Sequence, residues 1–93
     1  MNFVGSWTKV TSTDCDRKYP AQIEFRETRY VGQKGPDQDF VIWDVGGYVV
    51  SSDNEAMIQI ATDEQVQYRF QLDGETLTFV DPDGCEFSYQ RVA

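Results

Sequence analysis

Hydrophobic and polar residues alternate most regularly near the end of the chain, where three consecutive strands are predicted. Apolar side chains occupy every second position from Val66 to Leu72. This period of two favours a strand with one buried and one solvent-exposed face. Asp73-Gly74 then predicts a two-residue turn that pairs Leu72 with Glu75 and directs the apolar groups of both strands to the same side.

The following segment predicts a second hairpin. Pro82-Asp83-Gly84 fits a three-residue loop, with proline at the first turn position and glycine where a left-handed residue is needed. This loop sets Phe79 against Phe87 and Leu77 against Tyr89, so the third strand presents its apolar residues to the same face. Residues 66–89 are therefore predicted to form a three-stranded antiparallel meander.

The rest of the chain predicts further short strands, separated by polar or glycine-containing turns. They are expected at residues 3–11, from residue 23, around residue 30, and at residues 40–50 and 57–61. The pair Gly46-Gly47 inside residues 40–50 is interpreted as a bend, a bulge or a turn between two short strands. No segment of useful length has helical periodicity.

About eight short strands at nearly regular spacing predict an all-β fold, either a barrel or a sandwich. We expect a small antiparallel up-and-down barrel, because pairing the first strand with the last removes the free edges of a small sheet. The chain has 93 residues, which suits one domain spanning residues 1–93.

The chain is acidic, with a net charge of −8, and the charge is unevenly distributed. Residues 1–34 carry six basic and four acidic side chains, whereas residues 35–93 carry two basic and twelve acidic ones. So few Lys and Arg residues argue against binding to nucleic acid. The acidic surface has two interpretations: it keeps a small protein soluble, or it docks onto a basic partner. The longest apolar run, residues 40–43, is too short for a membrane span, and no signal peptide is visible.

Two short motifs resemble the lipocalin-like, or calycin-type, barrels. They are Gly5-x-Trp7 on the first predicted strand and Phe87-Ser88-Tyr89-Gln90-Arg91 on the last. The resemblance implies that Trp7 plugs the closed end of the barrel and that Arg91 packs over it, both in structural roles. This chain is much shorter than true lipocalins and lacks their C-terminal helix. In size it is similar to small bacterial lipocalin-like domains and to compact barrel inhibitors of secreted metalloproteases.

Residues for catalysis are scarce. The chain contains no histidine, which removes the usual general base, the commonest zinc ligand and the partner of serine or cysteine nucleophiles. Asp44, between Trp43 and Val45, would be a candidate acid or ligand contact if it faced the interior, where burial raises the pKa of a carboxyl group. Asp81, Asp83 and Glu86 lack the regular spacing of a calcium loop. We expect no enzyme activity, no cofactor and no metal, with a pair of carboxylates as the remaining catalytic option.

Cys15 and Cys85 are the two cysteines. If the first and last strands pair, the segment after Thr11 lies near the start of the last strand, so both cysteines fall at one end of the barrel. A disulfide between them would place the protein in the periplasm or outside the cell, whereas reduced thiols would suit the cytoplasm.

Two classes of non-enzymatic function remain. A carrier or sensor of a small apolar ligand would need a hollow barrel, with Trp43, Asp44, Tyr48, Tyr68 and Phe70 as candidate contacts. A protein-interaction or inhibitor module would need a filled core and exposed loops, with Gly32 to Asp39 and Ser51 to Glu55 as candidate contacts. We favour the interaction module, because this many aromatic side chains would fill a narrow barrel. The sequence leaves the partner and the oligomeric state open.

Overall fold

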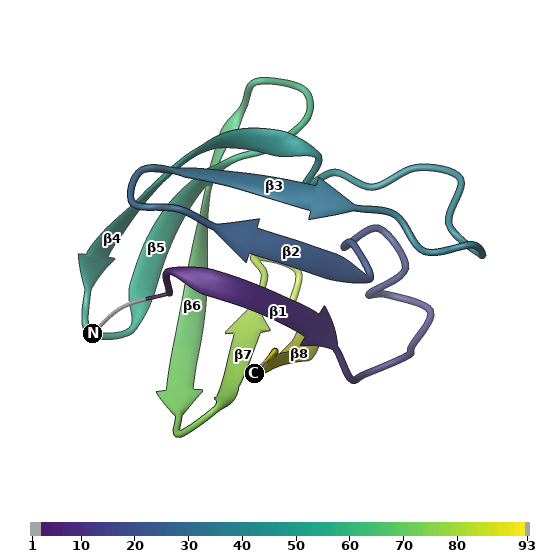
Figure 1. Cartoon of the computed structure of the whole chain (residues 1–93). Coiled ribbons are helices and arrows are strands. Elements are labelled where there is room, and N and C mark those ends of the chain that lie inside the picture. Colours follow the sequence, from purple (N-terminus) through teal and green to yellow (C-terminus); the bar gives the residue numbers. More distant parts are fainter. Residues whose placement is uncertain (1–2, 93) are drawn as a thin grey trace.

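A computed structural model describes residues 3–92, which form eight antiparallel strands and no helix (Figure 1). The strands are β1 (Gly5–Lys9), β2 (Gln22–Phe25), β3 (Arg29–Gln33), β4 (Val45–Ser52), β5 (Glu55–Gln59), β6 (Gln65–Asp73), β7 (Thr76–Val80) and β8 (Glu86–Arg91). Each strand pairs with the next in chain order, and β8 pairs with β1 to close the barrel. The predicted all-β, up-and-down barrel is confirmed. Residues 1–2 and 93 of the expected single domain lie outside the described residues.

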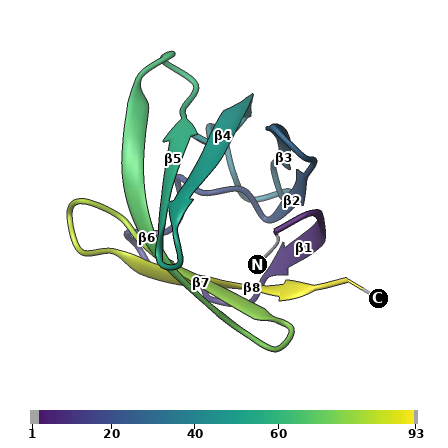
Figure 2. The same cartoon turned by 90° about the vertical axis from the view of Figure 1, so that its left-hand side faces the viewer.

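The connections between strands gather at two ends of the barrel, because consecutive strands are antiparallel. We call one the disulfide end; it holds residues 10–21, 34–44, 60–64 and 81–85. The opposite end holds residues 3–4, 26–28, 53–54 and 74–75. The long connections that follow β1 and β3 project together on the right of Figure 1. Figure 2 shows the strands arranged around a common interior.

The two predicted hairpin registers differ in outcome. Phe79 pairs with Phe87 and Leu77 with Tyr89, so the register of β7 and β8 is confirmed. The register of β6 and β7 is wrong by two residues, because Leu72 pairs with Leu77 and the turn is formed by Gly74-Glu75. Gly74 has φ 62°, and a turn with glycine at its first central position suits this conformation. The shift by two leaves the same side chains facing inward, so the predicted apolar face survives the error.

Several predicted strand limits are also wrong. β1 is shorter than expected and β4 begins only at Val45, so the predicted strand at residues 40–50 is half loop. Val41 and Trp43 turn inward over the disulfide end, and the Ile42 amide donates to the Lys18 carbonyl rather than to a strand. Gly46-Gly47 is no bend: both glycines lie inside β4, and the irregularity falls between Val50 and Ser52.

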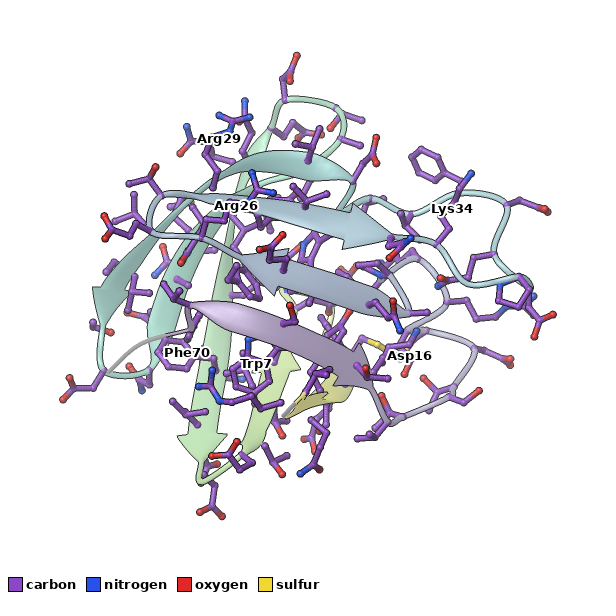
Figure 3. All side chains as sticks on the ribbon, in the orientation of Figure 1. Trp7, Asp16, Arg26, Arg29, Lys34 and Phe70 are labelled. Carbon is purple, nitrogen blue, oxygen red and sulfur yellow. A yellow bond between two sulfur atoms is a disulfide. The ribbon has the colours of Figure 1, made fainter. Side chains whose placement is uncertain are left out.

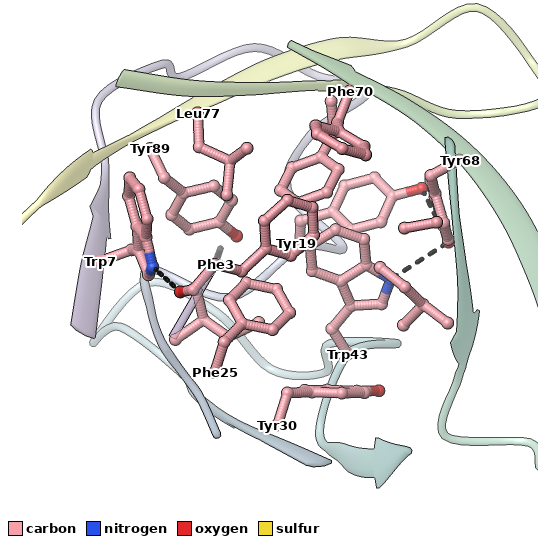
Figure 4. Packing of buried hydrophobic residues seen from close by; sticks show 14 of the residues in the cluster. Phe3, Trp7, Tyr19, Phe25, Tyr30, Trp43, Tyr68, Phe70, Leu77 and Tyr89 are labelled. Carbon is pink, nitrogen blue, oxygen red and sulfur yellow. Dashed lines mark hydrogen bonds between the residues drawn. The ribbon is translucent and has the colours of Figure 1, made fainter. Parts of the chain in front are cut away.

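Aromatic side chains fill the barrel (Figure 4). Phe25 on β2 and Phe79 on β7 come from opposite walls, yet their ring centroids are 6.3 Å apart. Trp43 lies between walls, 4.9 Å from Phe79 and 6.3 Å from Tyr30. Phe3 packs 4.6 Å from Phe70. Direct contact between rings across the barrel means that side chains occupy its interior.

Candidate functional site

The motif residues of the lipocalin-like resemblance lie together. Trp7 is fully buried, and its indole Nε1 donates to the Phe3 carbonyl at 2.8 Å (Figure 4). The Arg91 guanidinium lies 4.3 Å from the Trp7 ring and donates to the Val4 carbonyl at 2.9 Å. Arg91 passes so close to Gly5 that a Cβ there would be 2.7 Å from its Nη1. The cation stacked on the indole stabilises the junction of β1 and β8.

The candidate ligand contacts do not share one cavity: Tyr48 borders a surface groove of about 480 Å³, and Phe70 borders a separate one of about 540 Å³. Trp43, Tyr68 and Phe70 are buried in ring contacts with other core residues. Tyr48 packs on Phe25, and its hydroxyl donates to the Arg26 carbonyl. Asp44 is exposed and precedes β4, so it lies outside the strand that the sequence predicted. The burial on which a role as acid or ligand contact depended is therefore not present.

A chain of buried polar groups runs from the core to the disulfide end. The Trp43 indole donates to the Tyr68 hydroxyl at 3.1 Å, and Tyr68 lies 3.5 Å from the Tyr19 hydroxyl. Tyr19 donates in turn to Asp81 Oδ2 at 2.7 Å. Burial raises the pKa of the Tyr19 phenol far above its ordinary value, and burial also raises the pKa of Tyr68. Both phenols therefore stay protonated; the Tyr68 hydroxyl accepts from Trp43, and the Tyr19 hydroxyl donates to Asp81.

Asp81 is a buried carboxylate that organises the turn between β7 and β8. Its Oδ1 accepts the amides of Asp83 and Cys85 at 3.0 and 2.9 Å, and Lys18 Nζ lies 3.7 Å from Oδ2. Burial alone would raise the pKa of Asp81, but the hydrogen bonds from Tyr19, Cys85 and Asp83 and the Lys18 charge outweigh it, so the pKa is lowered. The turn chemistry used to explain this segment from the sequence did not reveal the Tyr19 contact.

Asp16 is the second buried carboxylate and organises the connection after β1 (Figure 3). It accepts the Thr11 hydroxyl at 2.7 Å and the Thr13 amide at 3.0 Å, and it pairs with Lys9 Nζ at 3.3 Å. Lys9 Nζ also donates to the carbonyls of Asp16 and Tyr19. Burial opposes ionisation of Asp16, but these hydrogen bonds and the Lys9 charge lower its pKa. No local sequence signal distinguished Asp16 from the other acids.

The two long connections of the disulfide end are joined by one side chain. Gln38 Nε2 donates to the carbonyls of Arg17 and Tyr19, at 2.9 and 2.7 Å. Its Oε1 accepts the amides of Ala21 and Gly35, at 3.0 and 2.8 Å. Both ends of the amide are therefore used to hold residues 34–44 against residues 10–21.

The same connections enclose a groove with a volume of about 660 Å³. Its walls include the exposed side chains of Asp14, Arg17 and Asp37. Phe40, which lines a second groove that shares Asp14 and Asp37 with the first, is 60% exposed. The two loop segments that the sequence proposed as contacts do not meet, because residues 32–39 lead into the disulfide end and residues 51–55 form the opposite end.

The disulfide predicted from the strand pairing is present: Cys15 and Cys85 are bonded, with their Cα atoms 5.9 Å apart. It joins the connection after β1 to the turn between β7 and β8. A disulfide is compatible with an oxidising compartment.

The excess negative charge lies at the disulfide end. Its connections contain nine carboxylates and three cations, which gives a net charge of −6; the residues are Asp14, Asp16, Asp37, Asp39, Asp44, Asp63, Glu64, Asp81, Asp83, Arg17, Lys18 and Lys34. The strands carry four of each sign and are neutral. The connections of the opposite end carry three carboxylates and one cation, which gives −2. The charge asymmetry seen along the sequence is therefore an asymmetry between the two ends of the barrel.

Residues 3–92 hold no group of three or more acidic, cysteine or histidine side chains arranged to bind a metal ion. They also include no helix of the length and hydrophobicity needed to cross a membrane.

Comparison with known proteins identifies no relative. No protein-family model matches the chain. No curated protein and no solved structure is significantly similar to it. The fold defines the class as a small closed antiparallel β-barrel, consistent with a calycin-like architecture, while the lipocalin-like assignment stays a resemblance.

Proposed function

We propose that the protein is a non-enzymatic interaction module that presents its disulfide end to a basic surface of a protein partner. The observation that carries this proposal is the contact of aromatic rings from opposite walls, because a filled barrel leaves the connections as the surface available for recognition. The alternative, a carrier of a small apolar ligand, would require those rings to separate.

The disulfide end suits recognition because its loops are held in place. The disulfide, the Gln38 hydrogen bonds and the Lys9–Asp16 pair each fix the connection after β1. A preorganised surface loses less conformational entropy on binding than a flexible one. An inhibitor of the kind suggested by the resemblance would use such a rigid end.

The charge of this end indicates the class of partner. Asp14 and Asp37 are exposed beside the groove, and among residues 3–92 neither side chain has a hydrogen-bond or ion-pair partner. Carboxylates concentrated at one end attract a basic surface and orient the approach of the two proteins.

The proposal is tested by NMR titration of the ¹⁵N-labelled protein with a lysine-rich probe peptide. We expect salt-dependent shifts in residues 12–17 and 35–40, and weaker binding after the double substitution Asp14→Asn and Asp37→Asn. The matched control is Glu27→Gln with Asp53→Asn at the opposite end, where both side chains are exposed. Shifts confined to the opposite end, or equal effects of the two double variants, would contradict the proposal.

The carrier alternative is tested with a fluorescent fatty acid. We expect no shift of the buried Trp43 and Phe79 resonances at saturating probe, since the rings already fill the barrel. Stoichiometric binding with shifts of these core signals would favour the carrier instead.

We further infer that the protein works in an oxidising compartment, such as the periplasm or the extracellular space. Mass spectrometry of protein isolated from its natural source, with thiols alkylated at lysis, tests this. The expected result is that Cys15 and Cys85 resist alkylation until a reductant is added. Two alkylated thiols would place the protein in a reducing compartment.

A further inference from the structure

The two buried carboxylates of residues 3–92 both lie at the disulfide end, and neither belongs to a strand. Asp16 holds the connection after β1, and Asp81 holds the turn between β7 and β8. Every other acid described is at least partly exposed. Acidification would therefore remove the internal charge of one end and leave the interior of the barrel unchanged.

Each carboxylate is surrounded by donors that need it to be ionised. Asp16 faces the Lys9 ammonium from β1 and the Thr11 hydroxyl and Thr13 amide from its own connection. The Tyr89 phenol from β8 also lies near Asp16, but its hydroxyl donates to the Pro20 carbonyl. Protonation would leave the Lys9 ammonium, whose side chain is 10% exposed, without its counter-ion. A buried cation without a counter-ion is strongly unfavourable, which favours movement of Lys9 into water. That movement would also break its hydrogen bonds to the Asp16 and Tyr19 carbonyls and so open the connection.

Asp81 faces a similar set of groups. They are the Tyr19 hydroxyl and Lys18 ammonium from the connection after β1, the Tyr68 phenol from β6, and Asp83 from its own turn. Protonating Asp81 would replace an acceptor of the Cys85 and Asp83 amides with a weaker one. The contact between the connection after β1 and the turn between β7 and β8 would then depend on the disulfide and on the long Lys18–Asp83 ion pair.

We propose that the disulfide end opens at low pH, because protonation of Asp16 and Asp81 releases residues 10–21 and 81–85 while the barrel stays closed. The strand ladders contain no buried acid, and the core phenols remain neutral in acid. The disulfide does not titrate, so the released segments stay tethered and can return when the pH rises. This inference does not depend on the proposed function.

The direction of the pH dependence follows from the lowered pKa of both groups. A carboxyl whose pKa is lower in the folded state stabilises that state above its ordinary pKa, and the stabilisation is lost as the pH falls. The ordinary value is 3.8, so the opening should begin near this pH and become complete below it.

The test is amide hydrogen exchange of the oxidised full chain between neutral pH and pH ~2, normalised to the intrinsic rate at each pH. We expect protection of residues 10–21 and 81–85 to fall by at least about tenfold as the pH drops, while β3 to β6 stay protected. A single transition in which loops and strands lose protection together would overturn the proposal. Retained loop protection at the lowest pH would also overturn it.

Variants separate the two carboxylates from general effects of acid. Asp16→Asn should open residues 10–21 at neutral pH, and Asp81→Asn should open residues 81–85, with strand protection unchanged in both. Asp14→Asn is the matched control on the same connection, because this side chain is exposed, and its loop and strand protection should equal that of the wild type. If Asp16→Asn weakens the whole barrel, the pH titration of the wild type still decides between local and global opening.

Discussion

At the scale of single residues, neighbouring positions that look alike in the sequence have different structural roles. Gly46 and Gly47 are adjacent on β4, but their side-chain positions point to opposite faces. A Cβ on Gly46 would lie 2.7 Å from the Gln59 carbonyl of β5, whereas the nearest atom to a Cβ on Gly47 would be 3.6 Å away. Only the first glycine is required by the close approach of two strands.

We therefore predict opposite outcomes for two alanine substitutions. Gly46→Ala should lower the free energy of unfolding by about 1–3 kcal/mol, because the backbone of β5 must move. Gly47→Ala should be neutral or stabilise by up to about 1 kcal/mol, since it restricts the unfolded chain without a clash. Urea denaturation monitored by tryptophan fluorescence measures both. Equal destabilisation would show that the glycines are needed for another reason.

The buried Tyr19 hydroxyl gives a second prediction at this scale. Tyr19→Phe removes a donor to an ionised, buried carboxylate and should cost about 1.5–3 kcal/mol of stability. It should also raise the pH at which the turn between β7 and β8 opens, because Asp81 loses a hydrogen bond that favours its charged form. The control is Tyr48→Phe, whose hydroxyl donates to a partly exposed carbonyl and should cost about 1 kcal/mol or less. Denaturation at neutral pH and acid titration test the two effects. A smaller loss for Tyr19 than for Tyr48 would contradict this account.

At the scale of elements, the alternation of apolar and polar residues predicts which face of a strand is buried. Strand limits and site residues that depend on long-range contacts are not predicted. Strand periodicity predicted the inward-facing residues of β6 to β8 correctly. The error of two residues in the register of β6 and β7 does not change which side chains face inward. The start of β4 was missed because Val41 and Trp43 have strand-like residue types but cap the barrel end. Gln38 and Tyr19 were missed as site residues, because most of their partners lie on other connections. Asp16 was missed because its partners, Lys9, Thr11 and Thr13, follow no distinctive spacing in the sequence. The cysteine pair could be predicted because it follows from closing β1 on β8.

Gln38 provides a prediction about how one connection is held by another. Gln38→Ala removes four hydrogen bonds to backbone groups and should lower the stability by about 1–3 kcal/mol. The rate of amide exchange should rise more in residues 34–40 than in the strands, since the strands do not depend on this side chain. Gln67→Ala on the exposed face of β6 is the control and should change neither quantity. Uniform acceleration of exchange through the barrel would rule out a local role for Gln38.

At the scale of the whole molecule, the concentration of carboxylates at the disulfide end should lower the stability of the protein and favour binding of a basic partner. The disulfide end holds nine carboxylates and only three cations, so its carboxylates repel one another. Salt screens repulsion between exposed charges that are more than about 10 Å apart. Raising the salt concentration should therefore increase the melting temperature. Replacing Asp14, Asp37 and Asp39 with asparagine should raise it at low salt and reduce its dependence on salt.

The same triple variant should bind the lysine-rich probe more weakly, because it removes exposed carboxylates beside the groove. The control replaces the three carboxylates of the opposite end, with Glu27→Gln, Asp53→Asn and Glu75→Gln, and should leave probe binding unchanged. Calorimetry gives the melting temperature and NMR titration gives the affinity. A gain in stability together with a loss of binding would mean that the acidic end is maintained for recognition at the expense of stability. If neutralising the disulfide end changed stability but not binding, the acids would serve solubility alone.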